Sequence, residues 1–154
     1  MYKNILVPHA GTTAGNKALA YAKEMAKKHQ SKITLLHVVE KIHLPASIGF
    51  SYKRKAWAKD IQNAQKEMKN EMHEKLTELA NRLKKEDISV AVKVIHGYPD
   101  EEIIRIIKEN SFDTVIMAKR RKLPGLKAIL QLGSVSRKVL ERASCPVMLI
   151  DGAK

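Results

Sequence analysis

The chain has 154 residues, which suits a single domain, and 44% of them are hydrophobic, which excludes a compositionally disordered protein. No apolar run approaches the roughly 18 residues that a membrane-spanning helix needs, and the first residues lack the apolar core and cleavage site of a signal peptide. A lone cysteine, Cys145, excludes an internal disulfide framework. These features predict one cytoplasmic domain that covers residues 1–154 and has no membrane partner.

The formal net charge of +13 is concentrated late in the chain. Residues 119–142 hold eight Lys and Arg residues against one acid, Glu141, so this segment alone carries +7. Residues 53–86 instead mix ten cations with six acids. A local basic zone predicts an anionic ligand or polymer, and nucleic acid is one such polymer, although no aromatic stacking platform accompanies these cations. The alternative is a solvated basic face without a ligand.

The first half of the chain contains two apolar runs. Residues 5–7, which end at Pro8, and residues 33–39 predict buried strands, and their lack of alternation is typical of a parallel sheet covered on both faces. Between them, Ala, Leu and Met recur at helical spacing over residues 14–26, with Thr12 or Thr13 as the cap. Residues 40–56, which include Pro45 and Gly49, predict a long connection.

The second half continues the alternation of helix and strand. Apolar residues keep a 3.6-residue period from Trp57 to Leu83, which predicts one long amphipathic helix. Further strands are predicted over residues 88–95, 114–117 and 147–150. Pro99 begins one of the helices between them, and the other begins near Gly133. This order predicts an α/β protein with a parallel sheet and right-handed crossovers.

Ligands of doubly wound sheets bind beyond the carboxyl ends of the strands, at the point where the strand order reverses. The loops that follow the first and fourth strands are therefore the predicted site. The basic segment that begins at Lys119 follows the fourth strand directly.

Three segments resemble the universal stress protein family: residues 4–8 with Gly11-Thr12, residues 113–117, and Leu132-Gly133-Ser134-Val135-Ser136 with the later Cys145-Pro146-Val147. The resemblance implies a five-stranded parallel sheet in the order 3-2-1-4-5 with helices on both faces, a Rossmann-like fold of the adenine-nucleotide alpha-hydrolase type. It also implies a homodimer formed by antiparallel pairing of the last strand, through Val147, Met148, Leu149 and Ile150.

Many members of that family bind ATP, so the resemblance implies ATP or another adenine nucleotide, with Mg²⁺ beside it, at the predicted site. Small residues let the backbone approach phosphates, and the free amides of a helix N-terminus hold them. Ser134 and Ser136 can cap that helix and donate hydroxyls. The implied contact residues are Pro8, His9, Ala10, Val38, Val39, Met117, Ala118, Lys119, Arg120, Gly133, Ser134, Val135 and Ser136.

The sequence departs from the family's ATP motif, which is a glycine, two residues, a second glycine, nine residues and then Gly-Ser or Gly-Thr. Ala118 and Arg121 occupy the two glycine positions, and eleven residues separate Arg121 from Gly133. Ala10 occupies the position of the family's usual acid. The lost glycines disfavour a triphosphate, whereas residues 119–122 add four cations that can hold phosphate oxygens. AMP or a cyclic nucleotide, a nucleotide-free dimer that acts through partner proteins, and a binder of polyanions stay as alternatives.

Catalytic signatures are missing from the sequence. It contains no His-x-Gly-His tetrad, no Gly-x-x-x-x-Gly-Lys-Ser/Thr phosphate loop and no Cys and His pair with zinc spacing. His9 and His37 follow strand ends and offer a general base, but a structural or adenine-contacting role is predicted ahead of it. The sequence therefore predicts no catalytic residue and no metal site, and slow ATP hydrolysis is the most that it allows.

Overall fold

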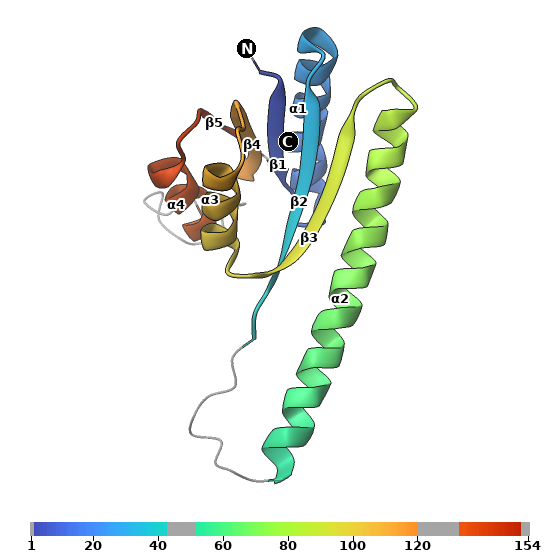
Figure 1. Ribbon diagram of the computed structural model, residues 1–154, viewed down its shortest axis with the longest axis vertical. Coiled ribbons are helices and arrows are strands. Elements are labelled where there is room, and N and C mark those ends of the chain that lie inside the picture. Colours follow the sequence, from blue (N-terminus) through green and yellow to red (C-terminus); the bar gives the residue numbers. More distant parts are fainter. Residues whose placement is uncertain (1, 43–51, 120–132, 152–154) are drawn as a thin grey trace.

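The computed structural model describes residues 2–42, 52–119 and 133–151 (Figure 1). Strands and helices alternate along these residues, as the apolar runs and helical periods predict. The elements are β1 (Asn4–Pro8), α1 (Thr13–His29), β2 (Lys32–Glu40), α2 (Tyr52–Lys84), β3 (Val90–Gly97), α3 (Pro99–Glu109), β4 (Thr114–Lys119), α4 (Ser134–Arg142) and β5 (Val147–Asp151).

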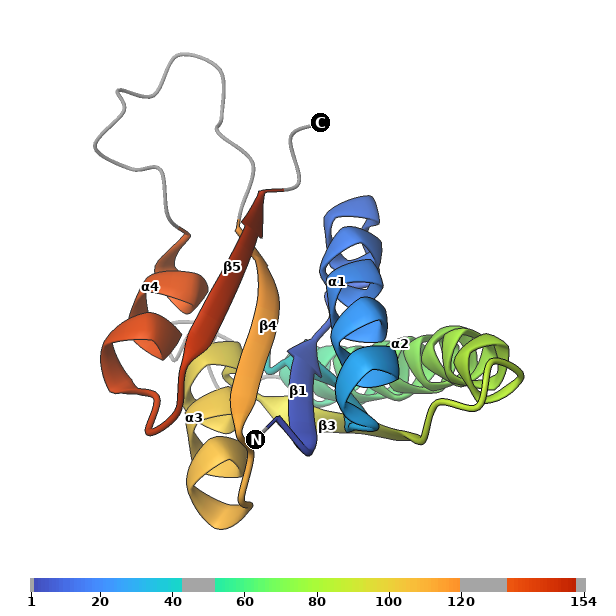
Figure 2. The ribbon, with the colours of Figure 1, turned by 90° about the horizontal axis from the view of Figure 1, so that it is seen from above.

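The strands form one parallel sheet in the order β3-β2-β1-β4-β5, which confirms the predicted fold class and strand order. Helices α1 and α2 cover one face and α3 and α4 the other (Figure 2). Because neighbouring side chains of a strand point to opposite faces, each strand serves both cores. In β1, Ile5 and Val7 join the core under α1 and α2, whereas Leu6 joins the core under α3 and α4.

Helix α2 begins at Tyr52, five residues before the predicted start at Trp57. Its last turns bury Leu76 and Leu83 against the sheet, and the same apolar stripe continues toward the start of the helix, where Trp57 and Met68 are 48% and 49% exposed. Figure 1 shows why: the first half of α2 extends past the ends of the strands. None of the helices in the described ranges is long and apolar enough to cross a membrane.

Asp113 joins the starting ends of β1 and β4. Its Oδ2 accepts hydrogen bonds from the Lys3 and Asn4 amides at 2.6 and 2.8 Å, and its own amide donates to the Asn4 carbonyl at 2.9 Å. These backbone donors, Asn4 first, lower the pKa of the Asp113 carboxyl. We call this arrangement the Asp113 clamp. It lies beside the registered β1–β4 pairs, Ile5 with Thr114 and Leu6 with Val115.

Candidate functional site

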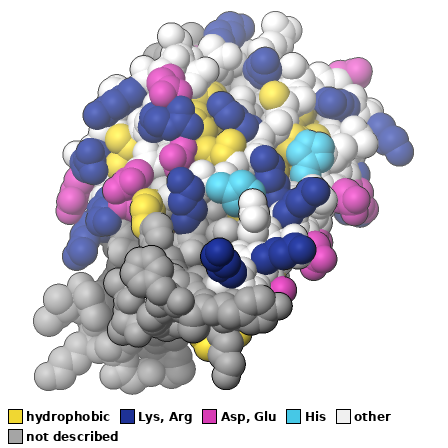
Figure 3. Space-filling view, turned by 60° about the horizontal axis from the view of Figure 1, so that its bottom comes forward, with side chains coloured by type: hydrophobic (Ala, Val, Ile, Leu, Met, Phe, Trp, Pro, Cys, Tyr) yellow, Lys and Arg dark blue, Asp and Glu magenta, His cyan; other side chains and the backbone are white. Residues whose placement is uncertain are grey.

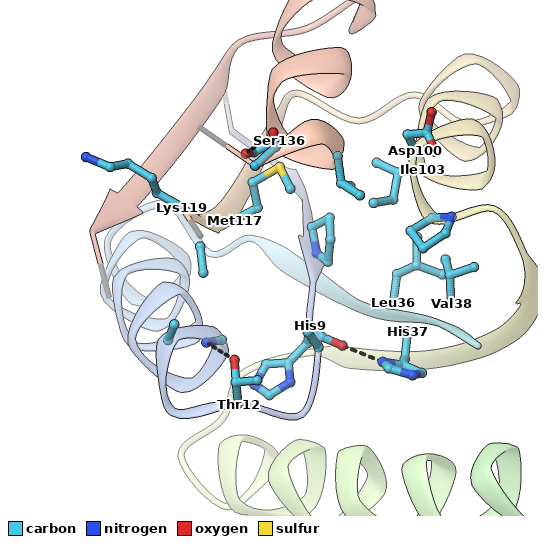
Figure 4. A pocket seen from close by; sticks show the side chains of 18 of the residues that line it. His9, Thr12, Leu36, His37, Val38, Asp100, Ile103, Met117, Lys119 and Ser136 are labelled. Carbon is cyan, nitrogen blue, oxygen red and sulfur yellow. Dashed lines mark hydrogen bonds between the residues drawn. The ribbon is translucent and has the colours of Figure 1, made fainter. Parts of the chain in front are cut away.

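A crevice of about 950 Å³ lies at the carboxyl edge of the sheet, where β1, β2 and β4 end and α1, α3 and α4 begin (Figure 4). This is the point at which the strand order reverses, and it is the place that the fold predicts for a ligand. The predicted contact residues that line the crevice are Pro8, His9, Ala10, Val38, Met117, Ala118, Lys119, Gly133, Ser134, Val135 and Ser136.

Val39 does not line the crevice. Its side chain is 1% exposed and lies in the core under α1 and α2, on the opposite side of the strand from Val38. The alternation of a strand thus corrects the prediction that both valines contact a base. Arg120, with Arg121 and Lys122 beyond it, lies outside the described residues.

The ring of His9 is buried between β1 and the first turn of α1. Its Nδ1 accepts from the Gly11 amide and its Nε2 donates to Asn16 Oδ1, both at 3.0 Å, so this hydrogen-bond pattern assigns a neutral ring with the proton on Nε2. A Cβ on Gly15 would come within 2.9 Å of that nitrogen, so Gly15 leaves the space for the ring. His9 therefore shapes the loop after β1 by its side chain, and its carbonyl accepts from His37 Nδ1 at 2.7 Å (Figure 4).

Burial lowers the pKa of His9, with smaller contributions in the same direction from His37 and Lys75, and it outweighs the opposite effect of the hydrogen bond to Asn16. The unfolded chain takes up this proton at about pH 6.5, whereas the folded protein resists it. The contribution to stability is therefore complete above about pH 6.5 and falls as the pH drops toward the lowered pKa of the folded state. Urea unfolding from pH 8 to pH 5 should show a steeper loss of stability in the wild type than in His9→Gln.

His73→Gln is the matched control for this measurement, because it replaces a histidine that is exposed on α2 rather than a buried one. We expect the His73→Gln protein to follow the wild-type slope. Equal slopes for the wild type and His9→Gln would contradict the assigned burial of a neutral ring.

Three helices begin at the crevice, and of their N-cap residues only that of α1 makes a side-chain cap hydrogen bond. Thr12 Oγ1 accepts from the Gly15 amide at 3.2 Å at the start of α1, whereas the N-cap of α3 makes no side-chain cap hydrogen bond. The N-cap of α4 is Gly133, without a side-chain cap, and Ser136 Oγ donates to the Gly133 carbonyl at 3.0 Å. The predicted capping by Ser134 or Ser136 is thus corrected. An anion would meet the amides of α4 without displacing a side-chain cap.

The floor of the crevice is apolar, and the two Lys residues of its described lining, Lys119 and Lys138, are paired with acids. Leu36, Ile103 and Met117 are buried beneath it. The Lys119 side chain extends outward in Figure 4. Its Nζ lies 3.1 Å from Asp151 Oδ2 on β5. In this structure its charge is therefore engaged at the edge of the sheet, and a phosphate contact by Lys119 stays a prediction. Figure 3 shows Lys and Arg side chains interspersed with acidic ones over the face drawn there.

One ion pair in this wall was not predicted from the sequence. Lys138 of α4 reaches Asp100 of α3, with Nζ 2.6 Å from Oδ2, and both residues line the crevice. The signal was present, because Lys138 follows Ser134 by four residues and therefore shares its helix face, and α3 begins at the same edge of the sheet.

Two solved relatives have a nucleotide in their crystals. A universal stress protein family protein from Arabidopsis thaliana was solved with AMP bound; it has a TM-score of 0.62 at 18% identity and covers 97% of this chain and 91% of that one. A universal stress protein solved in complex with cAMP has a TM-score of 0.60 at 17% identity, with coverage of 99% and 98%. At these identities the likeness shows the fold.

Sequence comparison reaches the family level. Universal stress protein MJ0577 of Methanocaldococcus jannaschii is 30% identical over 156 residues, which cover 97% of this chain and 95% of that protein. The solved structure of universal stress protein UspA from Lactobacillus plantarum has a TM-score of 0.79 at 20% identity and covers 97% of both chains. A model of the universal stress protein family matches residues 1–151. The chain belongs to the universal stress protein family.

Proposed function

We propose that this protein binds an adenine nucleotide in the crevice and acts through that binding. The observation that carries the proposal is the start of α4, which lines a crevice with an apolar floor and whose amides have no side-chain cap among the described residues. Phosphate oxygens match the amides, and a purine matches the floor. The AMP and cAMP in the two solved relatives support the choice of an adenine nucleotide.

The two ends of the crevice give the ligand a direction. The phosphate would lie against residues 133–136, and the base would lie toward Leu36 and Val38 at the end of β2. Ala10 gives the ligand no carboxylate to contact, so the loop after β1 would meet it through backbone groups.

The described residues do not fit a Mg²⁺ site. In the described lining, carboxylates are carried by Glu40 and Asp100, and Asp100 is paired with Lys138. No group of three His, Cys, Asp or Glu residues within the described ranges could hold a metal ion. We therefore assign Mg²⁺ no protein ligand and base the proposal on amides and apolar contacts.

Calorimetric titration with AMP, cAMP, ATP and adenosine tests the proposal. We expect saturable binding of at least one nucleotide, with adenosine weaker because it lacks the group that meets the α4 amides, and GMP weaker than AMP. No heat and no thermal stabilisation with any adenine nucleotide at millimolar concentration would overturn it and favour a nucleotide-free interaction protein. Salt-dependent retention on nucleic acid alongside that result would favour a polyanion binder.

We also propose that β5 pairs with its copy in a second chain to form a homodimer. β5 lies at the edge of the sheet beside β4, and exposed edge strands invite pairing. Met148 is 38% exposed there, and Tyr21 of α1, on the same surface, is 58% exposed. Light scattering should give twice the chain mass of 17.4 kDa, and Met148→Glu should shift the protein to the single-chain mass. A wild-type mass of one chain would contradict the dimer.

A further inference from the structure

The ion pair of Asp100 and Lys138 lies at the wall of the crevice formed by α3 and α4 (Figure 4 shows Asp100 on α3). The Asp100 side chain is 14% exposed and the Lys138 side chain 50%, so one partner is largely removed from water. The Lys138 hydrogen bond is the main reason that the pKa of the Asp100 carboxyl is low. Water therefore screens the attraction between these two charges less than it screens a fully solvated pair.

Lys138 belongs to the same surface as the open amides of α4. It follows Ser134 by four residues, and long side chains of a helix lean back over the preceding turn. The ammonium therefore lies on the side of the helix N-terminus, where a phosphate would be held. Asp100, from the neighbouring helix, already neutralises that ammonium at 2.6 Å.

We propose that Asp100 is an internal competitor that occupies Lys138 until a phosphate group replaces it, and that it thereby sets which phosphates the crevice accepts. The inference rests on the proposed function, because the phosphate is that of the nucleotide. A phosphomonoester carries between one and two negative charges near pH 7, because its second pKa is about 6. A phosphodiester carries one charge, as the carboxylate does. A phosphomonoester or a polyphosphate therefore displaces the Asp100 carboxylate from Lys138 more readily than a phosphodiester does.

Titrations with inorganic tripolyphosphate and with AMP test the competitor separately from base recognition. We expect Asp100→Asn to bind tripolyphosphate about tenfold more tightly than the wild type and Lys138→Gln to bind it about tenfold more weakly, which is the effect of one partly desolvated ion pair. In a Lys138→Gln background, Asp100→Asn should change the affinity less than twofold, because there is no ammonium group left for Asp100 to release.

Glu101→Gln is the matched control. Glu101 is an exposed acid in the same first turn of α3, and its carboxylate is not the one paired with Lys138. The substitution removes the same charge from the same helix end and should leave the affinity unchanged. An equal gain in Asp100→Asn and Glu101→Gln, or an undiminished gain in the Lys138→Gln background, would overturn the competitor in favour of general electrostatic repulsion.

The two ligands separate this inference from the proposed function. Tripolyphosphate binding that responds to Asp100→Asn, without any AMP binding, would retain the competitor and overturn the nucleotide proposal. AMP binding that is equal in the wild type and Asp100→Asn would retain the nucleotide proposal and overturn the competitor. No binding of either ligand to either protein would overturn both.

Discussion

Replacing Gly133 by aspartate is expected to weaken AMP binding about 100-fold without loss of folding stability. Gly133 is the N-cap of α4 with φ −65° and ψ 156°, an extended conformation that any residue adopts. Aspartate is a preferred N-cap, so its carboxylate would accept the amides that are otherwise open to a phosphate. Hydrogen bonds to a charged group contribute about 1.5–3 kcal/mol each, and about 1.4 kcal/mol is a tenfold change, so the loss of two amides at the lower figure gives the expected factor.

Gly133→Asn distinguishes the effect of a negative charge at the N-cap from the effect of a side chain that occupies the α4 amides. Asparagine also caps helices and is close to aspartate in size, but it lacks the negative charge. We expect it to weaken AMP binding less than Gly133→Asp does, while urea unfolding shows both variants at or slightly above the wild-type stability. Wild-type affinity in Gly133→Asp would show that the ligand's phosphate does not lie at the start of α4.

Replacing Leu76 by alanine is expected to lower the free energy of unfolding by about 2–5 kcal/mol, as in other large-to-small changes at fully buried sites. Leu76 is 0% exposed and lies in the core where α2 covers the sheet. Its loss removes apolar contacts and leaves a cavity, and backbone hydrogen bonds of α2 do not compensate for either. Urea or thermal unfolding measures the difference.

Met68→Ala is the control on the same helix stripe, two turns earlier. Because Met68 is 49% exposed, its truncation removes little buried surface, and we expect a loss below about 1 kcal/mol. Similar losses for Leu76→Ala and Met68→Ala would mean that the projecting half of α2 is covered in solution.

The strands were predictable because the sheet is buried on both faces. Residues 5–7 and 33–39 are nearly continuous apolar runs, and a parallel sheet under two helix layers gives such runs. The order of the strands could not be predicted from periodicity, and its prediction came from the family resemblance. The start of α2 at Tyr52 was missed because residues 52–56 carry no apolar repeat.

The location of the crevice was predictable, but the direction of its side chains was not. The sequence places His9 and Lys119 at strand ends, yet the ring of His9 is directed into α1 by the space over Gly15, and Lys119 is drawn to Asp151. These directions depend on residues brought together only by the tertiary fold. The error at Val39 was avoidable, because adjacent residues of one strand cannot both face the same side.

The Asp113 clamp has a mechanical consequence for the sheet. Registered pairing between β1 and β4 is confined to residues 5–6 and 114–115, next to the clamp, and the crevice lies at the opposite ends of the same strands. In backbone terms, a short seam joins the block β3-β2-β1 to the block β4-β5. A molecule that contacts both Val38 in one block and Ser136 beside the other would bridge the two blocks. It would do so at the end of the strands opposite to the paired residues, where a rotation of one block relative to the other displaces atoms most. Occupancy of the crevice would therefore stiffen the whole sheet against shear, beyond the residues that the ligand touches.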